Sequence, residues 1–375
     1  MLKIMHCISD TNFGGAGRVL LNYLQHFDRE AFEVTVVLPK GSKLLDYLKS
    51  PDYSVVQFDG LYDRSYNKED IKGLVTLIKE LQPDIVHSHG ALSARIAAKK
   101  CRKKAVYTRH SVFDLPKWQT VAPGKWILGG INHRYADRII AVSPAAKTLL
   151  TDSGTKSEII DVVFNGVERI EMVPDTQKGE FCKRFGVSDT DFVCTILARL
   201  EAVKGHAYVI EAAKLLKNEG ITDIKILIAG TGGIEQQLKH LAKSNDVEDI
   251  VLFVGFVKDI PALLAVTDVQ LNASYGTEAT SMALLEGFSI GIPAIVSDFG
   301  GNPFVVNDGE NGLIFPKKNA AALARAIKTV KNNKDLYQKI SSGALSAFED
   351  RFTAAKMTEN TEKIYYQLLG VANND

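Results

Sequence analysis

Two glutamates in one short segment of the second half of the chain are the residues best placed to do chemistry. Glu278 precedes a stretch with helical periodicity, and Glu286 lies eight residues further on, inside that stretch. At a rise of about 1.5 Å per residue, the two carboxyl groups would lie roughly 8–12 Å apart. Two carboxyl groups that flank one glycosidic bond lie about 5–9.5 Å apart. The spacing therefore favours contacts with two ends of one long ligand.

The segment between these glutamates has the pattern of a helix that begins beside a ligand. Apolar, β-branched stretches at 269–273 and 293–298 flank it and predict strands covered by helices on both faces. The helix is expected to begin near Thr280 and Ser281, whose hydroxyls can cap free backbone donors. Unpaired N–H groups and the positive end of the helix dipole attract phosphate. The segment therefore predicts an anion site.

Three further residues follow predicted strands at the edge where ligands bind in parallel α/β sheets. Arg199 and Lys204 come after the apolar stretch 192–198, and two cations at such an edge suit a diphosphate. His110 ends the predicted strand 105–110. From the residues alone, solvated charges and a structural histidine explain the same pattern.

A glycine-rich loop follows the first predicted strand. Gly14 and Gly15 precede a helical pattern, which places backbone N–H groups at a possible anion site. A dinucleotide-binding fold would need an acidic residue at the end of the second strand, where this chain has Lys40. The chain also lacks G-x-x-x-x-G-K-[ST]. A nicotinamide-dependent oxidoreductase and a P-loop NTPase are therefore both disfavoured.

No metal site is expected. His87 and His89 alternate along a predicted strand and point the same way, but no third ligand is evident, so hydrogen-bonding histidines are favoured. The D-x-D sequence at 189–191 precedes a strand, away from the expected cleft, which indicates a turn. The four cysteines have no C-x-x-C spacing and are expected to be buried, reduced thiols: Cys7, Cys101, Cys182 and Cys194.

Strands alternate with helices in both halves of the 375-residue chain. This pattern predicts an α/β protein with two doubly wound parallel sheets that face a central cleft. The expected domains are 1–170 and 171–350, with 351–375 a helix that crosses back to the first domain. No apolar run approaches 18 residues and the first residues do not resemble a signal peptide, so a cytoplasmic protein is expected.

A basic stretch in the first half suggests an anionic partner. Residues 95–138 hold 11 basic and 2 acidic side chains, although the whole chain has a net charge of +1. Lys103 and Lys104 precede the only two tryptophans, Trp118 and Trp126. Tryptophan beside lysine is typical of a membrane interface. A solvated helix beside two core-capping tryptophans is the alternative interpretation.

These motifs occur in an order that resembles one known family. The Gly-Gly loop, V-H-S-H and T-R-H occur in the first half, and F-N-G-V at the junction. The second half has A-R-L followed by K-G, the Glu-x7-Glu segment, G-I-P and S-D-F-G-G. The chain resembles the retaining GT-B glycosyltransferases of the family 4-like group known as glycosyl transferases group 1. The resemblance covers nearly the whole chain and implies the GT-B fold.

The resemblance implies a role for each matching residue. His110 would contact the transferred sugar, Glu278 its hydroxyls, and Glu286 the ribose of the nucleotide. The remaining donor-binding residues would surround the two phosphates: Gly14, Gly15, Arg199, Lys204, Ala279, Thr280, Ser281 and Met282. We assign five further residues to the acceptor or to a membrane surface: His89, Lys103, Lys104, Trp118 and Trp126.

The implied reaction moves a hexose or N-acetylhexosamine from a nucleotide-diphosphate sugar, with UDP expected, to a glycan or lipid-linked acceptor. It would retain configuration and need no metal or other cofactor, and no nucleic acid is expected as a partner. Phe304 stands where the family often has Glu, and 279–281 stand where Gly-Phe-Gly is common. The alternatives are an epimerase or phosphorylase of the same fold, and a two-domain sugar-binding protein.

Overall fold

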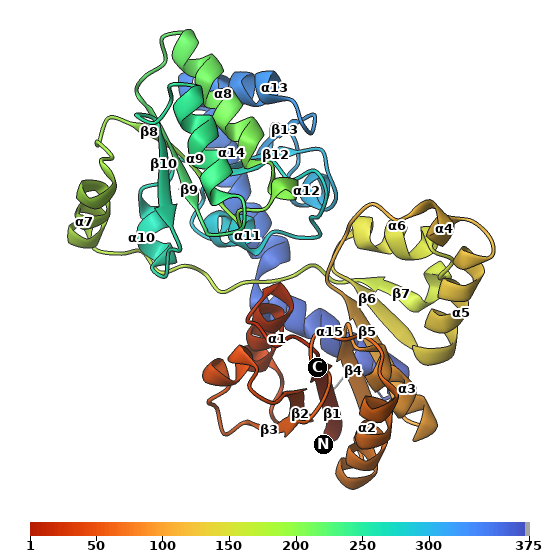
Figure 1. The fold of residues 1–375 in the computed structure, drawn as a ribbon. Coiled ribbons are helices and arrows are strands. Elements are labelled where there is room, and N and C mark those ends of the chain that lie inside the picture. The colour runs from red at the N-terminus through yellow and green to blue at the C-terminus, as the bar shows by residue number, and fades with distance from the viewer. Residues whose placement is uncertain (372–375) are drawn as a thin grey trace. The chain divides into compact units, whose positions relative to one another are not determined.

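Alternating apolar strands and amphipathic helices give the chain two parallel-sheet units (Figure 1). The computed structural model describes residues 1–371. Unit 1 comprises Met1–Val167 and the chain from Thr353 onward, and unit 2 comprises Glu168–Phe352. The two boundaries lie within three residues of the predicted ones. The expected α/β class with two parallel sheets is confirmed.

Unit 1 contains a seven-stranded parallel sheet in the order β3-β2-β1-β4-β5-β6-β7. The order reverses between β1 and β4, and ligands bind at such a switch point, beyond the carboxyl ends of the strands. The strands are β1 Leu2–Ile8, β2 Phe32–Pro39, β3 Tyr53–Phe58, β4 Ile85–His89, β5 Lys104–Arg109, β6 Arg138–Ala141 and β7 Ile160–Val162.

Helices connect these strands. Ser143 caps one of them, because its Oγ accepts a hydrogen bond from the Ala146 N–H at 3.3 Å and Pro144 opens the helix. The helices of unit 1 are α1 Gly15–His26, α2 Lys68–Leu81, α3 Leu92–Lys100, α4 Lys117–Thr120, α5 Gly124–Tyr135, α6 Pro144–Asp152 and α15 Ala354–Leu369, with 3-10 turns at Lys43–Tyr47 and Ser157–Ile159.

The last helix, α15, completes unit 1 although it follows all of unit 2 in the sequence. It packs beside α1, and its Tyr365 is fully buried. The Tyr365 hydroxyl forms a hydrogen bond with His87 Nδ1 on β4. A β-bridge between Val167 and Thr353 brings the entering and leaving segments together at the start of the helix.

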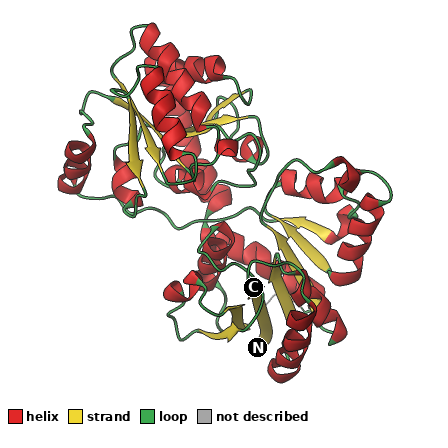
Figure 2. Ribbon diagram, in the orientation of Figure 1, coloured by secondary structure: helices red, strands yellow, loops and turns green. Residues whose placement is uncertain are grey.

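Unit 2 repeats the architecture of strands and covering helices (Figure 2). Its parallel sheet has six strands in the order β10-β9-β8-β11-β12-β13. Its strands are β8 Phe192–Leu197, β9 Ile224–Ala229, β10 Val251–Gly255, β11 Val269–Asn272, β12 Ala294–Ser297 and β13 Gly312–Phe315. Its helices are α7 Asp175–Phe185, α8 His206–Asn218, α9 Glu235–Ser244, α10 Ile260–Ala265, α11 Met282–Phe288, α12 Asn302–Val305, α13 Ala320–Asn332 and α14 Lys334–Ala347, with a 3-10 turn at Ala202–Lys204 and a π-helical turn at Phe348–Phe352.

The D-x-D sequence and the four cysteines were each assigned a structural role from the sequence. The D-x-D sequence forms a turn ahead of β8, where Asp191 accepts a hydrogen bond from the Ser188 N–H at 2.7 Å. All four cysteines are free thiols, but Cys101 and Cys182 are only half-buried, so the expectation of burial was wrong for these two. Across residues 1–371, no helix combines the length and apolarity that crossing a bilayer requires.

Candidate active site

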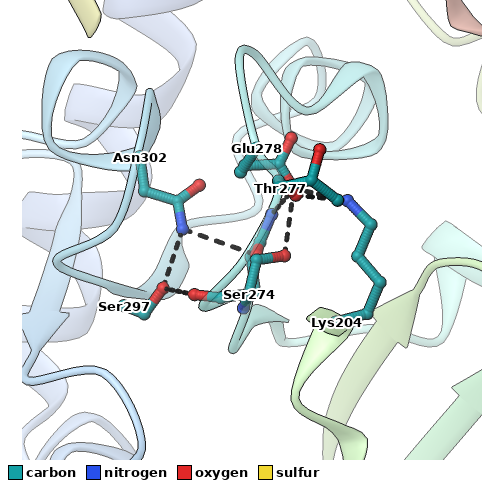
Figure 3. A network of polar contacts seen from close by, with 7 residues as sticks. Lys204, Ser274, Thr277, Glu278, Ser297 and Asn302 are labelled. Carbon is teal, nitrogen blue, oxygen red and sulfur yellow. Dashed lines mark hydrogen bonds and ion pairs between the residues drawn. The ribbon is translucent and has the colours of Figure 1, made fainter. Parts of the chain in front are cut away.

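A buried carboxylate lies at the centre of a polar network beyond the end of β11 (Figure 3). One oxygen of Glu278, Oε2, accepts hydrogen bonds from three donors: Lys204 Nζ at 3.1 Å, Asn272 Nδ2 at 2.9 Å and Ser274 Oγ at 3.1 Å. The Glu278 side chain is only 8% exposed. Because one oxygen has three partners, the carboxylate is fixed in position rather than free in a solvated loop.

A glycine allows Lys204 to approach this carboxylate. Gly205 has φ +76°, and a Cβ atom there would lie 2.0 Å from the Ala273 carbonyl oxygen. The loop therefore packs directly against the end of β11, where the Tyr275 N–H donates to the Val203 carbonyl at 2.9 Å. Lys204 also donates to the Thr277 carbonyl at 3.0 Å. A side chain at position 205 would separate the two segments.

The S-D-F-G-G loop supports the same segment from its other side. The Gly301 N–H donates to the Glu278 carbonyl at 3.0 Å, and a Cβ atom on Gly301 would lie 1.5 Å from the Ala279 carbonyl oxygen. Asn302 Nδ2 donates to Ser297 Oγ at 3.1 Å, and Ser297 donates to the Ser274 carbonyl. Strand β12 and the S-D-F-G-G loop at its end thus hold the backbone of 274–279 in place, as Figure 3 shows for Ser297 and Asn302.

The helix that follows begins directly after Ser281. Helix α11 begins at Met282, and Ser281 precedes it without a side-chain cap bond, so the predicted cap by the Ser281 hydroxyl was wrong. Ala279 and Thr280 are buried between Glu278 and this helix, whereas Ser281 and Met282 are half-buried. Glu286 lies on α11 and is buried.

The structure changes the interpretation of the two predicted cations. Arg199 is 74% exposed at the end of β8 and forms an ion pair with Glu201 at 2.7 Å. Lys204 is half-buried and forms an ion pair with Glu278, instead of standing beside Arg199 as a second free charge. The sequence could not indicate this pairing, because the two partners lie 74 positions apart.

Unit 1 contains, by itself, a chain of three histidines at the carboxyl ends of β1, β4 and β5. His110 Nε2 lies 2.9 Å from His89 Nδ1, and His89 Nε2 lies 3.0 Å from His6 Nδ1. Burial lowers the pKa of His110 to about 4 and of His6 to about 3, so both rings are neutral near pH 7. The sequence reasoning missed His6, although it occupies the strand that pairs with β4.

His6, His87 and His89 each place one ring nitrogen within 4.8 Å of the others. The sequence had suggested no third ligand, and the structure supplies one. Tetrahedral zinc, with bonds of about 2.1 Å, would need nitrogens about 3.4 Å apart. Moreover, His87 already contacts Tyr365 and Thr108 through its two nitrogens. Hydrogen-bonding histidines, the interpretation that the sequence favoured, explain the cluster.

A cavity of about 560 Å³ opens beside this histidine chain within unit 1. Its lining includes Asp10, His89 and His110, which come from the carboxyl ends of three neighbouring strands. Gly14 and Gly15 are exposed at the start of α1, and a Cβ atom on Gly15 would meet nothing within 4 Å. Packing therefore does not require glycine at position 15. Because no neighbouring atom covers this exposed position, a ligand can approach its backbone.

The tryptophans belong to an exposed apolar stretch, residues 113–127, and not to the core. Trp118 is 56% and Trp126 74% exposed, and the other large apolar side chains exposed there are Phe113, Val121 and Ile127. The core-capping alternative is therefore wrong. Lys104 is the first residue of β5 and Lys103 directly precedes it, whereas this stretch follows the other end of β5, so these lysines do not join the tryptophans as expected.

Comparisons with known proteins identify the family of this chain. The sequence model described as Glycosyltransferase Family 4 matches residues 13–169, and the one described as Glycosyl transferases group 1 matches residues 177–346. The two matches follow each other and together cover most of both units. The chain belongs to the family 4-like GT-B glycosyltransferases.

Individual relatives of this glycosyltransferase extend over almost its whole length. It is 27% identical to the UDP-Gal:alpha-D-GlcNAc-diphosphoundecaprenol alpha-1,3-galactosyltransferase of Escherichia coli, over 98% of this chain and 97% of the relative. The crystal structure of Anabaena HepE in complex with UDP has a TM-score of 0.84 at 20% identity, covering 98% of this chain and all of that one. A glycosyltransferase from Rickettsia africae has a TM-score of 0.83 at 21% identity, covering 99% of each. The two structures support the fold.

Proposed function

We propose that this glycosyltransferase transfers a hexose or N-acetylhexosamine from a UDP-sugar to a glycan or lipid-linked acceptor, with retention of configuration and without a metal. The observation that carries the proposal is the fixed Glu278 carboxylate in unit 2. Three donors hold one of its oxygens, which leaves the other oriented to accept hydrogen bonds from sugar hydroxyls. The UDP bound to HepE and the UDP-galactose donor of the E. coli relative support the choice of nucleotide.

The other groups of the site would act on the leaving diphosphate and on the reacting sugar. The exposed guanidinium of Arg199 and the backbone at 279–282 would bind the phosphates, with Lys204 contributing charge from beside Glu278. Glu286 would bind the ribose. In unit 1, Gly14 and Gly15 would lie beside the donor phosphate, and His110, neutral at pH 7, would contact the transferred sugar through a hydrogen bond.

Two substitutions test this assignment. Glu286→Ala should weaken binding of UDP, because it removes the ribose contact. Glu278→Gln should leave UDP affinity within about twofold and lower turnover by on the order of 100-fold, since it acts on the sugar. Calorimetry with UDP, GDP and ADP, followed by kinetics with the matching sugars, gives both readouts. Absence of heat with every nucleoside diphosphate, or unchanged kinetics in both variants, would reject the proposal.

The exposed apolar stretch supports binding to an anionic membrane surface. Trp118 and Trp126 alternate along the chain with Lys117 and Lys125, so apolar rings and cations lie in the same stretch. Rings of this kind sit at the level of lipid headgroups, and each nearby lysine adds about 1 kcal/mol on an anionic surface. A lipid-linked acceptor would then be reached at the membrane surface itself.

Sedimentation with phosphatidylglycerol vesicles tests the membrane contact. The protein should sediment at low salt, and the double change Trp118→Ser and Trp126→Ser should abolish this. Phe256→Ser is the matched control, because Phe256 is 71% exposed on unit 2, outside this stretch. Equal sedimentation of the tryptophan variant and the unchanged protein would refute the contact.

A further inference from the structure

The cavity of unit 1 contains a buried cation that has no acidic partner among residues 1–371. Arg95, on α3, is 5% exposed and lines the cavity. Its Nη1 donates to Asn132 Oδ1 at 3.1 Å, and its guanidinium stacks 4.2 Å from the centre of the Tyr107 ring. Its Nε is buried and has no hydrogen-bond partner. The contacts of this guanidinium are thus to neutral groups.

A second guanidinium contacts the same tyrosine. Arg109 also lines the cavity, and its Nη1 donates to the Tyr107 hydroxyl at 3.5 Å, while its Nε donates to the Ser111 carbonyl at 3.0 Å. Its guanidinium lies 4.9 Å from the centre of the Phe113 ring. Within residues 1–371, neither Arg95 nor Arg109 forms an ion pair with a carboxylate.

Burying an unpaired charge is unfavourable, and proteins normally satisfy such a charge with a counter-ion. Burial lowers the pKa of Arg95 for this reason, and Arg109 adds to the effect. Asp10 is the one acidic side chain in the lining, and burial together with Asp63 raises its pKa, which opposes its negative charge. His89 and His110 in the same lining are held neutral by burial. The lining therefore suits an anion from outside the chain.

We propose that Arg95 and Arg109 bind a diphosphate group carried by the acceptor. A diphosphate diester has two negative charges, which match the two guanidinium groups, and guanidinium is suited to phosphate oxygens. Phe113, Leu115, Leu128 and Ile131 line the same cavity and provide an apolar surface for a hydrocarbon chain. This site deepens the proposed function, on which it rests, by assigning the acceptor to the class of diphosphate-linked lipids.

Calorimetry on the full chain saturated with UDP tests the site, since UDP occupies any diphosphate site for the donor. Farnesyl diphosphate should bind, and farnesol should bind at least about tenfold more weakly. Arg109→Gln should weaken farnesyl diphosphate binding by about tenfold or more. Arg95→Met is the second variant, and its thermal unfolding is measured alongside. Lys100→Gln is the matched control, because it removes one positive charge from the exposed end of α3, the helix that carries Arg95.

The outcomes separate the possible sources of the phosphate. If inorganic pyrophosphate competes with farnesyl diphosphate, the site recognises the diphosphate alone. If farnesyl diphosphate binds and pyrophosphate does not compete, the site requires the hydrocarbon chain of the ligand as well. Equal binding of farnesol and farnesyl diphosphate, or unchanged affinity in Arg109→Gln, would overturn the proposal. If the protein binds farnesyl diphosphate but no nucleotide, the proposed diphosphate site is supported and the proposed nucleotide-sugar donor is rejected.

Discussion

At the scale of single residues, the ion pair between Lys204 and Glu278 stabilises the loop that carries the candidate site. Replacing Lys204 with Met leaves a buried carboxylate with only neutral donors, so unfolding free energy should fall by about 3 kcal/mol. Arg199→Met removes an exposed cation and should cost less than about 1 kcal/mol. Urea denaturation of both variants measures the difference. Equal losses of unfolding free energy in the two variants would mean that the Lys204–Glu278 ion pair stabilises the fold no more than the exposed Arg199 does.

The histidine chain makes a prediction about tautomers. Each link joins Nε2 of one ring to Nδ1 of the next, from His110 through His89 to His6. Three neutral rings joined in this way must all carry their proton on Nδ1 or all on Nε2. Nitrogen-15 chemical shifts of the imidazoles distinguish the two forms. A mixture of tautomers among the three rings would contradict the hydrogen-bonded chain.

Unit 2 has two histidines in contrasting surroundings, which gives a test by pH. Burial, together with the charge of Lys204, lowers the pKa of His206 to about 4, whereas His240 is exposed. The unfolded chain binds a proton at position 206 below about pH 6.5 and the folded chain does not, so stability falls as pH decreases from 6.5 towards 4. The slope should reach about 1.4 kcal/mol per pH unit.

The two matched variants isolate this contribution. His206→Gln should reduce the loss of thermal stability between pH 7 and pH 5, and His240→Gln should leave it unchanged. Differential scanning calorimetry at the two pH values gives both results. An identical pH dependence in His206→Gln and the unchanged protein would rule out the buried neutral histidine.

The sequence predicted which residues lie in the candidate site better than it predicted which side chains those residues contact. Glu278, Lys204 and His110 each follow a strand that is recognisable from local composition, so their position at the sheet edge could be inferred. Their partners come from distant segments: Lys204 meets Glu278 across 74 positions, and His89 meets His6 across 83. Hydropathy patterns report the face of an element and carry no information about such pairings.

At the scale of elements, α15 closes the core of unit 1 through Tyr365. Tyr365→Phe removes the hydroxyl that contacts His87 and leaves a buried ring nitrogen with one partner fewer, so stability should fall by about 1–3 kcal/mol. Tyr366→Phe is the control, because Tyr366 lies one position further along the same helix and is only half-buried. Thermal unfolding measures both. A larger loss in Tyr366→Phe would contradict this role of Tyr365.

The elements themselves were well predicted, because buried parallel strands are short, apolar and β-branched. Strands β5, β8, β11 and β12 coincide to within one residue at each end with the predicted segments 105–110, 192–198, 269–273 and 293–298. The beginning of α11 shows the limit of this reasoning. A serine at the expected cap position suggested a capping hydrogen bond, but the packing of Gly301 against the Ala279 backbone sets the conformation there. Tertiary contacts override a local capping signal at this position.

At the scale of the whole molecule, the two units differ in continuity along the chain: unit 2 is one segment and unit 1 is two. Unit 2 is one continuous segment with its own core, so residues 168–352 should fold alone, with sigmoidal urea unfolding and dispersed NMR spectra. Residues 1–167 lack α15 and should remain poorly folded in the same assays. Mixing them with a peptide of residues 353–375 should restore order. A well-folded 1–167 fragment would show that α15 is dispensable.

The place of α15 in the sequence also has a consequence for biosynthesis. A ribosome releases the β1–β7 region before unit 2, yet the side chain that satisfies His87 emerges with α15, after all of unit 2. Throughout translation of the second half, the surface around His87 and Phe32 therefore stays uncovered. The part of the enzyme that is made earliest is completed last, and until then its nascent form is a substrate for chaperones and proteases.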